Sequence, residues 1–194
     1  MTYQRSFDKR VRVGMVGVGG HAYRNILPAL NFLPVQLVAV ADVNEELAHR
    51  TAAQYGLEHG YASATDMYAH EDLDAVLICV SPQLHPALAI EAFQAGLHVW
   101  LEKPAATTVA EVDQMIAARG ELISTVGYKK VFMPAAVKLR ELITSGSLGQ
   151  LYTLLAQYPL SIPLGGSPAD NSMWLANGCH PVSLLLSIAG PAAG

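Results

Sequence analysis

Cysteine and charge are both scarce in this sequence. The 194 residues include two cysteines, Cys79 and Cys179, whose wide separation excludes a disulfide-stapled scaffold and a C-x-x-C metal knuckle. So few cysteines are typical of a reducing compartment, and we expect a cytoplasmic protein without a bound metal. Charged residues make up 14% of the chain, against about 25% in an average soluble protein.

Long runs of one residue class are missing as well. No run of lysine and arginine exceeds two residues and the net charge is −4, which argues against a nucleic-acid partner. No apolar run reaches the roughly 18 residues of a membrane span, and the polar first ten residues are unlike a signal peptide. Hydrophobic residues account for 52% of the chain, so we expect a folded protein with no membrane partner and exclude overall disorder.

Short apolar runs alternate with helical patterns in the first two thirds of the chain. The expected strands are residues 11–16, 35–40, 75–80, 99–101 and 123–126. The expected helices are residues 44–54, 83–95 and 108–119, the last opening with a capping box. This alternation predicts an α/β fold, a doubly wound parallel Rossmann sheet. We assign this dinucleotide-binding domain to residues 1–127.

The pattern changes after Gly127. Residues 134–145 form an amphipathic helical pattern, residues 150–158 resemble a strand, and residues 161–171 are rich in proline, glycine and serine. A further helical pattern covers residues 174–189. We expect an incomplete α+β second domain over residues 128–194, for substrate binding or oligomerisation.

A glycine-rich turn follows the first expected strand directly. Gly17, Gly19, Gly20, His21 and Ala22 fall in a G-x-G-x-x-A pattern, which allows a tight turn, close approach of a pyrophosphate and close helix–strand packing. Asp42 ends the second strand 20 residues after Ala22, at the spacing of a carboxylate that binds a ribose 2′-hydroxyl. A carboxylate there repels a 2′-phosphate, so the sequence favours NAD, with NADP left open.

Three motifs between Asp72 and Thr108 carry a family resemblance. They are the turn Ser81-Pro82-x-x-His85, the A-G-x-H-V pattern at residues 95–99 and the triplet Glu102-Lys103-Pro104. This segment closely resembles the Gfo/Idh/MocA family of NAD(P)-dependent oxidoreductases, which act mostly on sugars, cyclitols and related alcohols. Residues 127–134, 146–149 and 178–181 resemble later motifs of the same family.

The resemblance implies roles for individual residues. Lys103 matches the lysine that exchanges a proton with the substrate, and a lysine can do so when burial or nearby positive charge lowers its pKa. His180 matches a second acid–base residue. The resemblance also implies a cis bond before Pro104. Lys103, Glu102, Ser81, Pro82, His85 and His21 are then expected to line or order the cofactor crevice, while a simple salt-bridge role stays open for Glu102 and a place in the core for His180.

Two departures from the family pattern separate this chain from its relatives. Many members carry an aspartate four residues before the catalytic histidine, where this chain has Ala176. Members also continue into a large antiparallel sheet, of which this sequence shows one expected strand. We expect either a truncated chain, which we favour, or a chain that completes itself as a homo-oligomer.

Three functions follow from these observations. The leading one is an NAD(P)-dependent dehydrogenase acting on a sugar-like or cyclitol-like alcohol. The alternative, motivated by Ala176 and the missing sheet, is a catalytically degenerate dinucleotide-binding regulator or sensor. A methyltransferase shares the glycine turn and acidic strand end, but the Glu102-Lys103-Pro104 triplet disfavours it.

Overall fold

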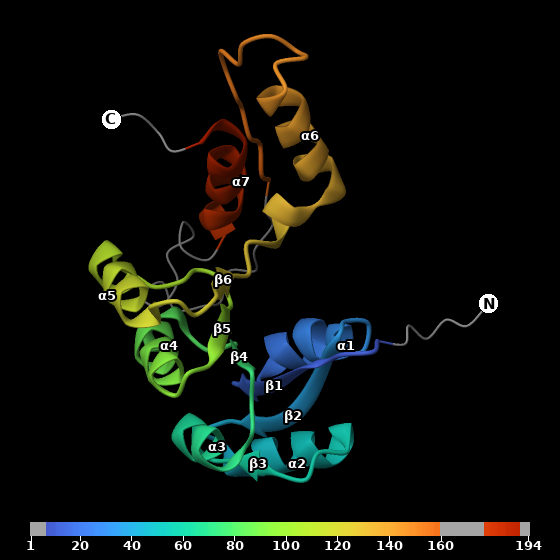
Figure 1. Ribbon diagram of the computed structural model, residues 1–194, viewed down its shortest axis with the longest axis vertical. Coiled ribbons are helices and arrows are strands. Elements are labelled where there is room, and N and C mark those ends of the chain that lie inside the picture. Colours follow the sequence, from blue (N-terminus) through green and yellow to red (C-terminus); the bar gives the residue numbers. More distant parts are fainter. Residues whose placement is uncertain (1–6, 160–176, 191–194) are drawn as a thin grey trace, which may run out of the picture. The chain divides into compact units, whose positions relative to one another are not determined.

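The structure is a computed structural model that describes residues 7–159 and 177–190. The chain divides into two compact units, Met1–Val126 and Gly127–Gly194 (Figure 1). In the described residues no helix is both long and apolar enough to cross a bilayer.

The first unit contains a sheet of six parallel strands in the order β3-β2-β1-β4-β5-β6. The strands are β1 (Val11–Val16), β2 (Val35–Ala41), β3 (Gly60–Tyr61), β4 (Ala75–Ile78), β5 (His98–Leu101) and β6 (Ser124–Val126). The chain reverses its direction of winding between β1 and β4, and ligands of such sheets bind at that point, beyond the carboxyl ends of the strands. The predicted Rossmann fold is confirmed.

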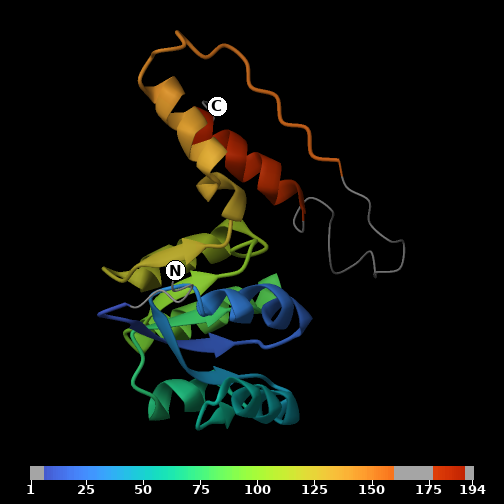
Figure 2. The same cartoon turned by 90° about the vertical axis from the view of Figure 1, so that its right-hand side faces the viewer.

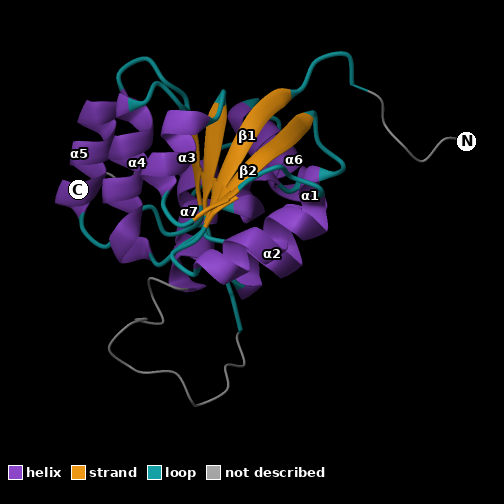
Figure 3. Ribbon diagram, turned by 90° about the horizontal axis from the view of Figure 1, so that it is seen from below, coloured by secondary structure: helices purple, strands orange, loops and turns teal. Residues whose placement is uncertain are grey.

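Helices cover both faces of this sheet (Figure 3). One face carries α1 and α2, and the other carries α3, α4 and α5. The helical segments are η1 (Ala22–Ile26, a π-helical turn), α1 (Leu27–Leu30), α2 (Glu45–Tyr55), α3 (Ala64–His70), η2 (Pro82–Leu84), α4 (His85–Gln94) and α5 (Val109–Arg119).

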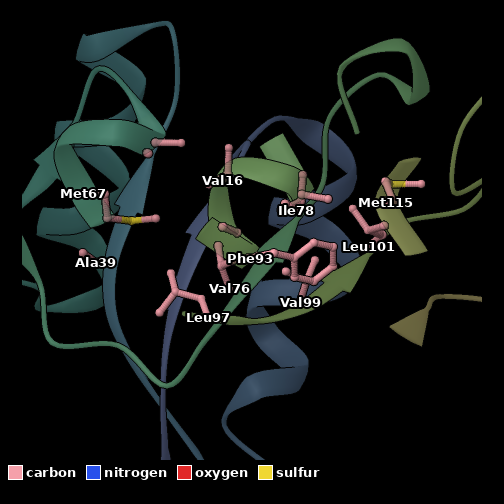
Figure 4. Close-up of a cluster of buried hydrophobic side chains, with 14 of the residues drawn as sticks. Val16, Ala39, Met67, Val76, Ile78, Phe93, Leu97, Val99, Leu101 and Met115 are labelled. Carbon is pink, nitrogen blue, oxygen red and sulfur yellow. The ribbon is translucent and has the colours of Figure 1, made fainter. Parts of the chain in front are cut away.

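Side chains of successive strand residues enter two separate cores. Met15 packs under α1 and α2, whereas its neighbour Val16 packs on the other face of the sheet. Figure 4 shows this second core, in which Ile78 and Leu101 from β4 and β5 meet Phe93 from α4. Because both faces of β4 are covered, this strand is apolar along its whole length.

The second unit is helical in its described part. Its elements are η3 (Lys129–Phe132), α6 (Pro134–Thr144) and α7 (Cys179–Ala189). Helices α6 and α7 lie against each other (Figures 1 and 2). The strand expected at residues 150–158 is wrong: no described segment of this unit pairs with it, and a strand needs a partner for its backbone N–H and C=O groups.

Candidate functional site

The predicted glycine turn and the predicted lysine lie at the same edge of the sheet. Three backbone hydrogen bonds tie the strand ends together there: Gly17 N–H donates to Ala41 O at 2.8 Å, Cys79 N–H to Val16 O at 2.8 Å, and Glu102 N–H to Ile78 O at 2.9 Å. These bonds continue the parallel ladders beyond β1, β4 and β5. They therefore hold the glycine turn and Glu102 at the carboxyl edge, where such sheets bind ligands.

The first two glycines of the turn, Gly17 and Gly19, are explained by different features of the structure. Gly17 has a φ of 85°, and a Cβ there would lie 2.4 Å from the carbonyl oxygen of Cys79. A Cβ on Gly19 would meet nothing within 4 Å. Gly17 is thus required by the fold itself, whereas the space over Gly19 is open to a ligand such as a pyrophosphate.

Asp42 directly follows β2, and its side chain holds the glycine turn in place. Its Oδ2 accepts a hydrogen bond from Val18 N–H at 2.9 Å, and its Oδ1 accepts one from Asn44 N–H at 2.9 Å. Each carboxylate oxygen has further lone pairs that a ribose hydroxyl can use. The carboxylate therefore orders the turn and can still accept hydrogen bonds from a ligand.

The remaining residues of the turn begin the helical segment η1. Ala22 is fully buried, and Gly20 and His21 are exposed. Beside them lies a cavity of about 320 Å³. Its lining includes Gly19, Gly20, Tyr23, Arg50, Thr51 and Gln54.

Glu102 joins the glycine turn to the lysine. Its Oε1 lies 3.2 Å from His21 Nε2, and its Oε2 accepts a hydrogen bond from the backbone N–H of Lys103 at 2.9 Å. The Glu102 side chain is 13% exposed and that of His21 is 50% exposed. The two residues are 81 positions apart in sequence, and their side chains thus meet at the same edge of the sheet.

The Lys103–Pro104 peptide bond is cis, as the resemblance implies. Pro104 is buried, and its carbonyl oxygen lies 2.9 Å from Nδ1 of His85, the first residue of α4. His85 is fully buried, and this burial lowers its pKa. The structure thus places His85 in the interior behind the triplet.

Ser81 and Pro82 form the link between β4 and α4. Ser81 is exposed, and its carbonyl oxygen accepts a hydrogen bond from Leu84 N–H at 2.9 Å, which closes η2. Pro82 is half-buried at the first position of that turn. Both residues follow β4, from which Cys79 and Val80 separate them.

The pKa of the Cys79 thiol reflects the burial and the charges at this edge. Burial, and to a smaller extent the charge of Glu102, raise the pKa of this thiol to about 11, against an opposing effect of the charge of Lys103. Glu102 and Lys103 therefore both act on the same point, the end of β4. The Cys79 thiol stays protonated at neutral pH and is no nucleophile there.

His180 belongs to the second unit. It lies on α7 with 5% of its surface exposed, and its ring meets that of Tyr158 edge-on at 6.0 Å. Lys130 Nζ lies 4.6 Å from the centre of the same tyrosine ring. Ala176, at the position of the missing family aspartate, lies outside the described residues. His180 and Lys103 belong to different units, and their joint action stays a prediction.

Asn25 is a residue of this edge that sequence reasoning missed. Its Nδ2 lies 3.3 Å from His21 Nδ1 and 3.2 Å from the His21 carbonyl oxygen. The spacing of four residues along a helical segment was a signal for this contact.

The edge thus carries an open glycine, an acceptor carboxylate and a set of polar side chains, which together fit a dinucleotide. Residues that the structure describes form no cluster of three or more metal-ligating side chains.

Comparisons with known proteins agree with this fold. The model of an oxidoreductase family with an NAD-binding Rossmann fold matches residues 11–128, more than half of the chain. Myo-inositol 2-dehydrogenase of Thermotoga maritima is 27% identical over 186 residues, which cover 93% of this chain and 55% of that protein. The chain spans about half of the length of the curated relatives it matches.

Solved structures share the fold. The crystal structure of a probable dehydrogenase from Thermotoga maritima has a TM-score of 0.83 and 26% identity, covering 94% of this chain and 56% of that one. The WlbA dehydrogenase from Bordetella pertussis, in complex with NADH and UDP-GlcNAcA, has a TM-score of 0.78 and 25% identity, covering 94% of this chain and 59% of that one.

Proposed function

The chain belongs to the Gfo/Idh/MocA family of oxidoreductases with an NAD-binding Rossmann fold, and on that premise we propose that it transfers a hydride between a nicotinamide cofactor and a sugar-like or cyclitol-like alcohol. The observation that carries the proposal is the meeting of the glycine turn, Asp42 and the Glu102-Lys103 pair at one edge of the sheet. An inositol dehydrogenase among the relatives supports the substrate class.

Each part of the edge has a task in cofactor binding. The open backbone at Gly19 and the N–H groups at the start of η1 receive the pyrophosphate. Asp42 accepts a hydrogen bond from a ribose hydroxyl, which favours NAD over NADP. Ser81 and Pro82, which follow β4, border the nicotinamide half of the crevice.

Lys103 performs the proton transfer. Bound NAD supplies the hydride acceptor. As the hydride leaves the carbinol carbon, the hydroxyl on that carbon loses its proton, and the amine of Lys103 accepts it. In the reverse direction the ammonium of Lys103 returns the proton to the carbonyl oxygen. Glu102 holds the backbone of Lys103, and His180 serves as the second acid–base group.

The first test is a parallel titration with NADH and NADPH, followed by Trp100-sensitised nicotinamide fluorescence. We expect saturable binding with NADH preferred. A preference for NADPH would overturn the role of Asp42, and Arg50, which lines the cavity beside the turn, would then be the candidate for the 2′-phosphate. Binding of neither cofactor would overturn the proposed cofactor site.

The second test is turnover with NAD and a panel of polyols that includes myo-inositol, read as NADH absorbance. Lys103→Ala is expected to lower kcat at least about 100-fold while NADH binding persists. Lys138→Ala is the matched control, because Lys138 is an exposed lysine on α6. NADH binding without turnover on any polyol would favour the regulatory alternative. The cytoplasmic location and the homo-oligomer stay predictions.

A further inference from the structure

The two sequence neighbours of Lys103 are each held by a histidine from a distant segment. Glu102, before the lysine, meets His21 from the glycine turn at 3.2 Å. Pro104, after the lysine, meets His85 from the start of α4 at 2.9 Å. The backbone from which the Lys103 side chain projects is therefore fixed on both sides.

The partners of His21 determine which of its nitrogens carries the proton. The amide nitrogen of Asn25 can only donate, so His21 Nδ1 accepts this hydrogen bond. The Nε2–H group then donates to Oε1 of the Glu102 carboxylate. The other oxygen of Glu102 accepts from the Lys103 N–H at 2.9 Å. An unbroken chain of hydrogen bonds thus runs from Asn25 through His21 and Glu102 to the backbone of Lys103.

The His85 contact is of a different kind, because it is fully buried. A carbonyl oxygen only accepts, so Nδ1–H of His85 donates to Pro104 O. Burial keeps the imidazole neutral, with the proton on Nδ1. Since α4 is packed into the core through Ala89, Ala92 and Phe93, it provides a rigid support for this bond.

We propose that His21 and His85 are positioning residues for Lys103, acting through Glu102 and through the carbonyl group of Pro104. The proposal rests on the proposed proton transfer by Lys103. A lysine side chain is long and flexible, so the position of its backbone governs how often the amine reaches the substrate hydroxyl. A displacement of about 1 Å can cost up to about 100-fold in rate, even when binding is unchanged.

The two histidines use opposite ring nitrogens, which gives a reciprocal set of variants. Glutamine places its amide N–H near the position of Nε2, and asparagine places it near that of Nδ1. His21→Gln and His85→Asn therefore keep the donor, whereas His21→Asn and His85→Gln lose it. Thermal unfolding of all four variants, checked first, limits the comparison to folded proteins.

Lys103 can be observed directly, without a known substrate. The chain has five lysines, at positions 9, 103, 129, 130 and 138. Reductive methylation with ¹³C-formaldehyde labels each amine, and Lys103→Arg identifies the signal of Lys103. We expect His21→Asn and His85→Gln to shift or broaden that signal, while the signals of the other four lysines stay in place. His21→Gln and His85→Asn should keep the wild-type signal.

Turnover on the best polyol gives the second readout. The donor-losing variants should lower kcat about 10- to 100-fold with KM for the polyol changed less than about threefold, and the donor-keeping variants should restore most of the rate. An unchanged Lys103 signal in both donor-losing variants would overturn the proposal, as would equal losses in all four. A changed Lys103 signal in a chain that turns over no polyol would support positioning and count against the proposed function alone.

Discussion

The two units of the chain differ in how much apolar surface they bury. The first unit has a core on each face of its sheet. In the described part of the second unit, only His180 and Ile188 are buried, while Tyr152 is 85% and Leu155 79% exposed. An apolar groove of about 390 Å³ between α6, α7 and residues 154–158 is also open. The cofactor half thus carries its own core, whereas the described part of the second unit does not.

Separating the units gives the largest expected effect. Residues 1–126 alone should unfold cooperatively and gain thermal stability from NADH, because binding to the native state alone raises its stability. Residues 127–194 alone should show no cooperative transition in circular dichroism, because too little apolar surface is buried in their described part. A cooperative second unit, or an aggregated first one, would contradict the comparison.

Matched truncations of one side chain in each unit make the comparison quantitative. Ile78 is fully buried in the core of Figure 4, so Ile78→Ala should cost about 2–5 kcal/mol of unfolding free energy. Leu155→Ala in the second unit should change it by less than about 0.5 kcal/mol. Denaturant unfolding of both variants measures the difference, and equal costs would show that residues 150–158 are buried in solution.

The glycine turn allows the fold to be separated from ligand binding within the first unit. Gly17→Ala should cost at least about 2 kcal/mol, because an alanine at positive φ is strained and its Cβ meets the Cys79 carbonyl. Gly19→Ala meets no protein atom, so its stability should change by less than about 1 kcal/mol while NADH affinity falls about tenfold. Thermal unfolding and the NADH titration test both. A stable Gly17→Ala, or a Gly19→Ala with full affinity, would contradict this division of roles.

The smallest expected effect is a pH dependence from the interior of the first unit. Burial lowers the pKa of His85 below its usual 6.5, so the folded state binds this proton less tightly than the unfolded chain. Stability from this source is complete above about pH 6.5 and falls with pH, by at most about 1.4 kcal/mol per unit, until the lowered pKa is reached. His85→Asn, which cannot titrate, should flatten the slope of stability between pH 7 and pH 5. An unchanged slope would show that His85 does not contribute.

The difference in burial between the two units also explains which helices and strands the sequence predicts. Buried parallel strands are rich in apolar residues, so β1, β2 and β4 are visible as runs despite Arg12 and Gln36. The two-residue strand β3 is too short for any periodicity, although Ser63, which caps α3 and accepts from Asp66 N–H, was a usable signal. Residues 150–158 have apolar residues of strand type, but pairing depends on a partner that a local pattern does not contain.

The site likewise contains residues that local sequence patterns predict and contacts that they do not predict. The glycine turn and Asp42 are local motifs with fixed spacing, and the structure brings them together through Val18 N–H. The contacts of His21 with Glu102 and of His85 with Pro104 join segments 81 and 19 residues apart. No spacing rule covers these contacts, because they depend on how β1, β4 and β5 stand side by side. A sequence can therefore show which residues reach the edge, but the sheet determines which of them meet.

The two hydrogen bonds of Asp42 have a consequence for the speed of cofactor capture. Its carboxylate holds Val18 N–H and Asn44 N–H through bonds made within the protein itself, so the order of the turn does not depend on contacts from the dinucleotide. Association should then be a single step whose observed rate rises linearly with cofactor concentration in stopped flow. Differences in affinity between related cofactors would appear mainly in how long each one stays bound.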